Sequence, residues 1–243
     1  MEVGIVDREK LVNIADAVRK KTGITGAMTL DAIASNITSM PTADNNAKFD
    51  FSKSDNSNLL SYLTTIDLSS WDTSDVFDMR ELFDGCRGLT SLDLSKFNTS
   101  NVTNMSYMFQ NCSSLASLDL SNFDTSKVVS MNNMFYGCSS LTSLDLSNSD
   151  TLNVKFMSSM FENCFELSNL TLGTDWAINS RISSFDLSSC PLTRESAADV
   201  INKLATRSNS PVITFSNKVR LYQSEIDVAT NKGWSVSGCT VLV

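Results

Sequence analysis

The fold is decided by a 26-residue unit that reads GLTSLDLSKFNTSNVTNMSYMFQNCS from Gly88 to Ser113. Leucine, methionine, phenylalanine and cysteine each recur at this spacing without a slip. The four columns are Leu68, Leu94, Leu120, Leu146 and Leu172; Met79, Met105, Met131 and Met157; Phe83, Phe109, Phe135 and Phe161; and Cys86, Cys112, Cys138 and Cys164. Columns in phase over so many residues indicate a repeat architecture, in which neighbouring units stack to bury one continuous core.

Two apolar spacings alternate within each unit. The segment LTSLDL (residues 89–94) has the form L-x-x-L-x-L, which predicts a short strand with alternate side chains in the core. The segment MSYMFQNC (residues 105–112) places its Met, Phe and Cys at i, i+3, i+4 and i+7, which predicts about two turns of helix. Asn, Asp, Ser and Thr between them favour a turn and a helix cap. Each unit is therefore expected to contain one strand, one turn and one short helix.

The unit resembles the BspA-type leucine-rich repeats, a family rich in L-D-L-S-x-F-D-T-S-x-V-x-x-M-x-x-M-F-x-x-C. The resemblance covers residues 59–173 and implies an α/β repeat solenoid, a leucine-rich-repeat-like stack of short parallel strands and short helices. Repeats of this kind occur in bacterial surface adhesins and in bacteriophage tail proteins. After Leu172 the sequence GTDWAINSRISSFDLSSC lacks the Met-Phe-Cys segment, so a transition into a cap is expected there.

The first 40 residues are expected to form a small helical attachment module. Residues 11–23 (LVNIADAVRKKTG) and 28–37 (MTLDAIASNI) resemble the small N-terminal module of phage tail and baseplate proteins from hosts with Gram-positive walls. In that family the module attaches or organises the domains that follow it. A cap that shields the first coil is the alternative, and both roles can hold together. Residues 41–58 are polar and turn-rich, and a linker or lead-in is expected there.

Residues 174–243 are expected to be an α+β capping region with the order helix, strand, helix, strand. Thr193 is expected to cap the first helix, and Pro211 to precede a strand with the sequence VITF. Ser224 is expected to cap the second helix, and a final strand is expected over residues 234–243.

Charge is unevenly distributed along the 243 residues, whose net charge is -8. Residues 59–173 hold 5 basic and 13 acidic residues, whereas the flanks are nearly neutral. An acidic middle speaks against nucleic acid and anionic membranes as partners, and it suits cations, basic ligands or neutral glycans. No run of 18 apolar residues is present, and the start MEVGIVDREK lacks the apolar core of a Sec-type signal peptide. Membrane insertion and export by that route are therefore not expected.

The sequence carries no recognisable catalytic constellation. It has no histidine, no P-loop, no Gly-rich dinucleotide loop and no C-x-x-C pair, so no enzyme, cofactor or metal site is expected. A carboxylate pair of the glycoside-hydrolase kind stays open as an alternative, because acids are plentiful. The cysteine column could supply metal ligands or disulfides, but it shares an apolar face with Met and Phe and is expected to fill the core.

Candidate ligand-binding residues lie on the solvent side of the predicted strands. Each unit places an aspartate between two inward aliphatic residues, and in three of the four units a serine precedes that aspartate by two residues. The set is Asp67, Asp93, Asp119 and Asp145 with Ser91, Ser117 and Ser143. Stacked strands would put the aspartates about 4.8 Å apart, where like charges repel by roughly 1 kcal/mol even in water. Two interpretations stay open: a row that binds sugar or a cation, or scaffold aspartates bonded to nearby Ser or backbone donors.

The expected function is that of a bacteriophage virion structural protein, associated with the tail or baseplate, that displays its repeat surface for host-cell recognition or attachment. Its expected partners are other virion proteins, through the N-terminal module, and a host surface glycan or protein. Assembly in the bacterial cytoplasm and a homo-oligomer or symmetric array in the virion are expected. The alternatives are a bacterial cell-surface adhesin and a ligand-free decoration protein of the capsid or tail.

Overall fold

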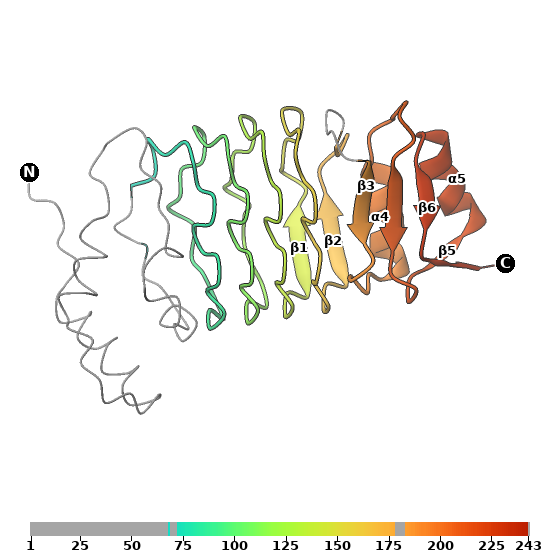
Figure 1. Cartoon of the computed structure of the whole chain (residues 1–243), viewed down its shortest axis with the longest axis horizontal. Coiled ribbons are helices and arrows are strands. Elements are labelled where there is room, and N and C mark those ends of the chain that lie inside the picture. Colours follow the sequence, from blue (N-terminus) through green and yellow to red (C-terminus); the bar gives the residue numbers. More distant parts are fainter. Residues whose placement is uncertain (1–67, 69–71, 178–182, 243) are drawn as a thin grey trace, which may run out of the picture.

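Successive coils of the chain stand side by side along the long axis of the molecule (Figure 1). The computed structural model describes Leu68, residues 72–177 and residues 183–242. The predicted N-terminal module, the lead-in at residues 41–58 and Asp67 lie outside these residues. Residues one repeat apart face one another in neighbouring coils; for example, isolated parallel bridges join Asp78, Asn104, Ser130 and Phe156 in turn. Positions that recur in the sequence therefore form columns along the axis.

Backbone hydrogen bonds join the coils along one side, which we call the turn row (residues 79–86, 105–112, 131–138 and 157–164). Four N–H groups of the first coil donate to carbonyls of the second at 2.8 to 3.0 Å: Met79 to Asn104, Glu81 to Ser106, Phe83 to Met108 and Gly85 to Gln110. The same four bonds recur at the next two junctions. Every second peptide therefore points its N–H toward the following coil and its carbonyl toward the preceding one.

The helix predicted for each unit is wrong. Residues 72–177 of the described chain contain no α-helix, and the turn row is a run of β-turns. In the second coil the N–H of Met108 donates to the carbonyl of Met105 (3.3 Å), and that of Cys112 donates to Phe109 (3.1 Å). The N–H groups of Tyr107, Phe109 and Asn111 bond to the next coil, so they cannot close the i to i−4 bonds of a helix within their own coil. All four side chains are nevertheless fully buried, because consecutive turns place apolar residues on one side at the same spacing as a helix.

Two positions in each turn row adopt a left-handed backbone, as a type II turn requires at its third residue. One column holds Gly85, Asn111, Gly137 and Asn163, with φ between 57° and 74°. Glycine and asparagine are the residues that reach this conformation at least cost, so their alternation here follows from the turns. The other column holds Glu81, Tyr107, Asn133 and Ser159, with φ between 53° and 61°.

The L-x-x-L-x-L segments form a second side, the leucine row (residues 89–94, 115–120, 141–146 and 167–172). Strands β1 (Ser143–Leu146) and β2 (Asn169–Leu172) pair in parallel, with Leu144 opposite Leu170. The predicted strand is thus confirmed in the last two units. In the first two units the described residues of this row form no strand, and other contacts hold those coils together.

A column of buried threonines, Thr73, Thr99, Thr125 and Thr151, supplies one such contact. The hydroxyl of Thr99 donates to the carbonyl of Asp124 (3.0 Å) and accepts the N–H of the same residue (2.8 Å). Thr73 makes the same pair of bonds to Asn98, at 3.0 and 2.7 Å. The hydroxyls of Thr73 and Thr99 therefore each fix the next coil through a backbone donor and a backbone acceptor, whereas Thr125 donates to the Asp150 carbonyl (2.8 Å) and Thr151 accepts the N–H of Ala177 (3.3 Å).

The core between the rows is built from stacked columns. The rings of Phe83, Phe109, Phe135 and Phe161 are fully buried and nearly parallel, with centroids 5.6 to 5.8 Å apart. Such pairs contribute about 0.5–1.5 kcal/mol each beyond the burial of their area. The next ring, Phe185, meets Phe161 edge-on, at an interplanar angle of 65°. The parallel stack therefore ends where the C-terminal region begins.

The C-terminal region alternates strands and helices (Figure 1). Its elements are β3 (Ser184–Leu187), α4 (Arg194–Lys203), β4 (Val212–Phe215), β5 (Arg220–Tyr222), α5 (Gln223–Asn231), β6 (Ser235–Ser237) and β7 (Thr240–Leu242). All pairings are parallel, in one sheet of order β3-β4-β6 and one of order β5-β7. Neither of these helices is long and apolar enough to cross a membrane, and the described residues contain no other candidate span.

This region continues both rows of the repeat. The Ser196 hydroxyl in α4 donates to the carbonyl of Leu170 (3.1 Å) and accepts its N–H (2.8 Å), so a helix takes the next place along the leucine row. Cys190 lies 26 residues beyond Cys164, and its thiol donates to the carbonyl of Phe161 at 3.5 Å. The cysteine column therefore extends one unit further than the sequence analysis recognised.

Most C-terminal elements fall where they are predicted. Thr193 caps α4 by accepting the N–H of Ser196 at 3.2 Å, and β4 follows Pro211 directly. The predicted Ser224 cap is wrong, since α5 begins at Gln223 with Tyr222 as its N-cap. The single final strand is also wrong. It is divided into β6 and β7 around Gly238, whose φ of +83° and contact with the Phe215 carbonyl leave no room for a Cβ.

Candidate binding surface

The predicted aspartates lie on the exposed side of the leucine row. Asp93, Asp119 and Asp145 are exposed, and the leucines on either side of them pack into the core. The expected strand pairing between neighbouring aspartates is not present in the described residues. Asp145 instead lies opposite Thr171 in the β1–β2 pair, so the acidic column ends there.

Each of these carboxylates closes a local turn. Its Oδ1 atom accepts the backbone N–H two residues further on: Asp93 from Ser95 (3.0 Å), Asp119 from Ser121 (2.9 Å), Asp145 from Ser147 (2.8 Å) and, in the C-terminal region, Asp186 from Ser188 (2.8 Å). Such turns are a common structural use of Asp and Asn. The recurrence of aspartate is therefore accounted for by the corner that follows each leucine segment.

The same bonds set the electrostatics of the corner. The backbone N–H of Ser95, and after it the Ser95 hydroxyl, holds the pKa of Asp93 below its usual value. The N–H and hydroxyl of Ser121 lower the pKa of Asp119 in the same way. These carboxylates are therefore ionised at neutral pH and already engaged with their own backbone.

The predicted serines are not drawn into this arrangement. Ser91, Ser117 and Ser143 are exposed, and within the described residues none of them forms a hydrogen bond to an aspartate of the column. The described residues also hold no group of three or more acidic or cysteine side chains placed to bind a metal ion. The leucine row therefore presents separate polar corners rather than a converged site.

A second outward surface, which was not among the predicted binding residues, lies on the turn row. Outward positions there are half-buried and belong to two columns. One column is Glu81, Tyr107, Asn133 and Ser159, and the other is Asp84, Gln110, Tyr136 and Glu162. Both columns lie on the side away from the buried Met, Phe and Cys, as the spacing of those buried residues requires of a helix or of consecutive turns.

Contacts across the coil junctions bring this surface together. The Gln110 amide donates to the Asp84 carboxylate at 3.1 Å, and the N–H of Asn111 donates to the carbonyl of Tyr136 at 2.7 Å. Tyr107 belongs to the same coil as Asn111 and has a φ of 61°. Tyrosine, asparagine and glutamine side chains suit ligand recognition, because each offers hydrogen bonds and the tyrosine ring adds apolar area.

The leucine row and the turn row differ in how much their outward residues vary from unit to unit. The outward column of the leucine row reads Asp, Asp, Asp, Thr at positions 93, 119, 145 and 171. The turn-row column at positions 81, 107, 133 and 159 changes chemical class from acid to aromatic to amide to hydroxyl. The fold fixes the left-handed backbone of this column but not its side chain, which differs in every otherwise similar unit. This variation is visible in the sequence when residues 81, 107, 133 and 159 are aligned and recognised as surface positions.

Residues 46–176 match the family described as "Mycoplasma protein of unknown function, DUF285", and the chain belongs to this family. The match covers more than half of the chain, and it fits a BspA-type repeat protein. No curated protein and no solved structure matches the chain.

Proposed function

We propose that this chain is a non-enzymatic display protein, a solenoid of the leucine-rich-repeat kind whose turn-row surface binds a ligand on a bacterial cell. The observation that carries the proposal is the contrast between columns: the turn-row positions vary from coil to coil on an otherwise repeated scaffold. A rigid stack with one variable exposed side is a common arrangement for extended binding surfaces.

Charge and chemistry narrow the class of ligand. The repeated part of the chain is acidic, which disfavours polyanions as ligands. The outward, half-buried side chains of the turn row combine tyrosines with amides and hydroxyls, which suits a neutral glycan. A host surface glycan is therefore the proposed ligand, with a surface protein as the alternative.

The setting that we propose is the tail or baseplate of a bacteriophage virion, with host attachment as the biological role. Support for this setting comes from the resemblance of residues 11–37 to phage tail modules, and these residues lie outside the described structure. Under this proposal the module binds other virion proteins, and the chain is a homo-oligomer or part of a symmetric array. A bacterial adhesin and a ligand-free decoration protein are the alternatives.

The binding test uses the fluorescently labelled full chain on purified cell-wall polysaccharides and on whole Gram-positive cells. Tyr107→Asn combined with Tyr136→Gln introduces the residues that the chain itself carries one coil away, at Asn133 and Gln110, so the fold should persist. We expect the Kd to rise about tenfold or more, because aromatic side chains dominate such interfaces.

The matched control is Asp93→Asn with Asp119→Asn. Asn98 forms the same kind of turn, since its Oδ1 accepts the N–H of Ser100 at 3.1 Å, so the corners should survive. We expect this variant to bind normally. Loss of binding in the aspartate variant, with the tyrosine variant unaffected, would move the site to the leucine row. Absence of binding to every polysaccharide and cell would leave only the decoration role.

A separate experiment tests the proposed location on the tail or baseplate of a phage virion. An antibody against the full chain should label the tail end of purified phage particles in electron micrographs. Label on the particle head would favour the decoration protein, and label on the bacterial wall without particles would favour the adhesin.

A further inference from the structure

Four outward residues of the turn row form a two-by-two patch. Tyr107 and Gln110 lie in the second coil, and Asn133 and Tyr136 occupy the same two positions, in that order, in the third coil. The tyrosines therefore stand on one diagonal and the amides on the other. All four side chains are half-buried, and we call the set the tyrosine–amide patch.

Backbone hydrogen bonds hold the four residues at fixed spacings. The N–H of Gln110 donates to the carbonyl of Tyr107, and that of Tyr136 donates to Asn133, both at 3.1 Å. Each pair therefore closes one β-turn, whose ends lie less than about 7 Å apart. The N–H of Asn111 joins the two coils by donating to the carbonyl of Tyr136 at 2.7 Å, and chains bonded in this way lie about 4.8 Å apart. The patch is therefore comparable in size to one sugar ring.

Three of the four side chains have polar atoms that the fold does not use. The Tyr107 hydroxyl, the Tyr136 hydroxyl and the Asn133 amide form no hydrogen bond to any of the described residues. Other outward amides are used by the fold: Asn101 and Asn153 each donate to a carbonyl of the preceding coil, at 2.9 and 2.6 Å. The Asn133 amide therefore remains available both as a donor and as an acceptor.

The backbone conformation of Tyr107 is not one that tyrosine favours. Its φ is 61°, in the left-handed region. Asparagine enters this region at lower cost, and Asn133 does so in the next coil with a φ of 55°. A bulky residue in such a conformation is typical of functional surfaces, where the side chain decides which residue is used.

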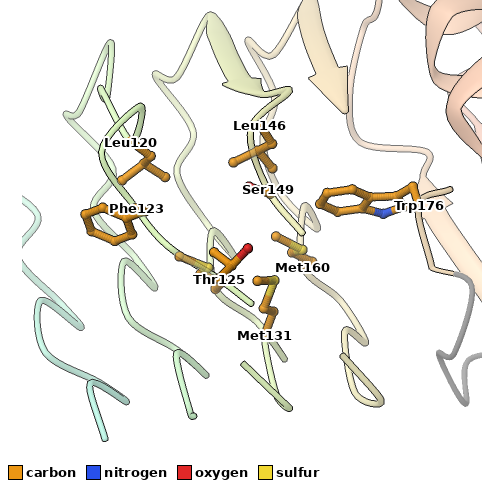
Figure 2. Close-up of a pocket in the computed structure, with 9 residues that line it drawn as sticks. Leu120, Phe123, Thr125, Met131, Leu146, Ser149, Met160 and Trp176 are labelled. Atoms are coloured by element: carbon orange, nitrogen blue, oxygen red, sulfur yellow. The ribbon is translucent and has the colours of Figure 1, made fainter. Parts of the chain in front are cut away.

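The cavity behind the patch is too small for a sugar (Figure 2). It is lined by residues that include Met131, Met134 and Trp176. Its volume, counted as the space open to a water molecule, is about 10 Å³, which is about the space of one water. A sugar in this part of the stack therefore has to bind to outward side chains.

We infer that the tyrosine–amide patch binds one N-acetylated hexosamine, a sugar ring that carries an acetamido group. This inference rests on the proposed function and names the sugar class that the turn row takes. An acetamido group presents an N–H, a carbonyl and a methyl group. The Asn133 amide accepts from the first and donates to the second, and a tyrosine ring packs against the methyl group and the sugar ring.

The second amide of the patch serves the hydroxyl groups of the same sugar. One N–H of Gln110 donates to the Asp84 carboxylate at 3.1 Å, which holds the side chain in place. Its carbonyl oxygen and its other N–H remain for sugar hydroxyls. Glu162 follows Tyr136 in the same column of the fourth coil, so a sugar with a free ammonium group is the competing ligand that an experiment has to separate.

Three β-1,4-linked tetrasaccharides that differ in one substituent test the inference by calorimetry on the full chain. Chitotetraose carries acetamido groups, its de-N-acetylated form carries ammonium groups in mildly acidic buffer, and cellotetraose carries hydroxyls. We expect chitotetraose to bind about tenfold more tightly than the other two, because each lacks a partner for the Asn133 amide. Equal binding of cellotetraose, or tighter binding of the ammonium form, overturns the inference and leaves glycan binding in place.

Failure of the inference and failure of the proposed function give different results. Binding to whole cells or wall polysaccharides, without binding to chitotetraose, overturns only the inference. Absence of binding to cells, polysaccharides and all three tetrasaccharides overturns both.

Variants at Asn133 assign the preference to the patch. Asn133→Ser introduces the residue that the same column carries at Ser159, and Asn133→Gly suits the left-handed backbone, so the fold should persist in at least one of them. We expect both to lose the preference for chitotetraose over cellotetraose. Asn132→Ser is the matched control, because it removes the neighbouring amide outside the patch and introduces the residue found at Ser106; it should keep the preference. A preference that survives in a folded Asn133 variant, or is lost in folded Asn132→Ser, contradicts the site.

Discussion

At the scale of single residues, the buried cysteines act as hydrogen-bond donors as well as core residues. The thiols of Cys112, Cys138 and Cys164 each donate to the carbonyl of a phenylalanine in the preceding coil, at 3.1 to 3.2 Å. That carbonyl also accepts the N–H of the cysteine three residues after it, so the thiol uses its second lone pair. The spacing that places these cysteines on one face with Met and Phe predicts their burial, but the donor role depends on the register between coils.

Thiol labelling should distinguish one cysteine from the other five. Burial, with a smaller contribution from Asp84, raises the pKa of Cys86 to about 12, and burial likewise raises the pKa of Cys112 and Cys138. Since the thiolate is the reactive form, buried thiols should not react at neutral pH. We expect an aromatic disulfide reagent to label only the half-buried Cys239 in the folded chain, and all six thiols in denaturant. Rapid labelling of two or more thiols in the folded chain would contradict the arrangement.

The aspartate corners predict a loss of stability in acid. Hydrogen bonds from Ser121 lower the folded-state pKa of Asp119, so its stabilising contribution is complete above the unfolded pKa of about 3.9. That contribution is lost as the pH falls through the lower, folded pKa. Asp119→Asn keeps the turn but not the charge, so it should lower the melting temperature at pH 7 by less than Asp119→Ala does, while reducing its fall below pH 4. Asp119→Ala should lower the melting temperature at pH 7. Equal behaviour of the two variants would show that the turn bond is unimportant.

At the scale of elements, the turn row shows what the sequence could and could not predict. Spacing located the buried face of residues 105–112 correctly, because burial depends only on which residues point inward. It could not distinguish helix from consecutive β-turns, since both bury i, i+3, i+4 and i+7. The left-handed residues decide between them, and Gly85 and Gly137 in one column are the visible sign. Tyr107 and Tyr136 face outward in either arrangement, so the same spacing was sufficient to identify them as surface residues.

The threonine column can be tested with two substitutions at one site. Thr99→Ser keeps the hydroxyl that bonds both the N–H and the carbonyl of Asp124, and loses one methyl group. Thr99→Val keeps the shape and loses both bonds, and we expect it to cost about 1–3 kcal/mol of unfolding free energy. Chemical denaturation of the full chain measures both values. If the valine variant is as stable as the serine variant, the hydroxyl bonds of the threonine column do not stabilise the fold.

Two glycines of the turn row separate backbone strain from crowding. Gly85 and Gly137 both have a φ of +74°. A Cβ on Gly85 meets nothing within 4 Å, so Gly85→Ala should cost about 1–2 kcal/mol from the left-handed backbone alone. A Cβ on Gly137 would lie 2.6 Å from Oδ1 of Asn111, so Gly137→Ala should cost more. Equal losses in denaturation would mean that the Asn111 side chain moves aside freely.

At the scale of the whole molecule, stability is expected to be a sum over nearly identical junctions. The first three described junctions use the same four turn-row hydrogen bonds. The repeat itself could be recognised from the sequence, and its family match supports that recognition. The helix that follows β2 on the leucine row could not be placed, because α4 joins the stack through a serine hydroxyl rather than a repeated apolar residue.

Equivalence of the junctions predicts that one whole unit can be removed. Deleting residues 106–131 joins Met105 to Asn132. Asn132 occupies the position of Ser106 one coil later, so the order of positions along the chain is kept. We expect the shortened chain to fold and to unfold cooperatively at a lower temperature, as measured by calorimetry and size-exclusion chromatography. Deleting residues 106–118 removes half a unit and serves as the control, because it puts turn row against leucine row. An unfolded full-unit deletion, or a folded half-unit deletion, would contradict junction equivalence.

The alignment of the turn-row hydrogen bonds with the long axis also has a mechanical consequence. A force that pulls one end of the stack away from the other acts along these bonds and loads every junction equally, and a terminal coil, which has a neighbour on one side only and therefore a single junction, is expected to detach first. When that junction opens, one coil of 26 residues is released, which adds about 90 Å of extended chain. Under tension the stack is therefore expected to open one equivalent junction at a time. It lengthens in discrete steps and keeps the remaining coils intact while it yields.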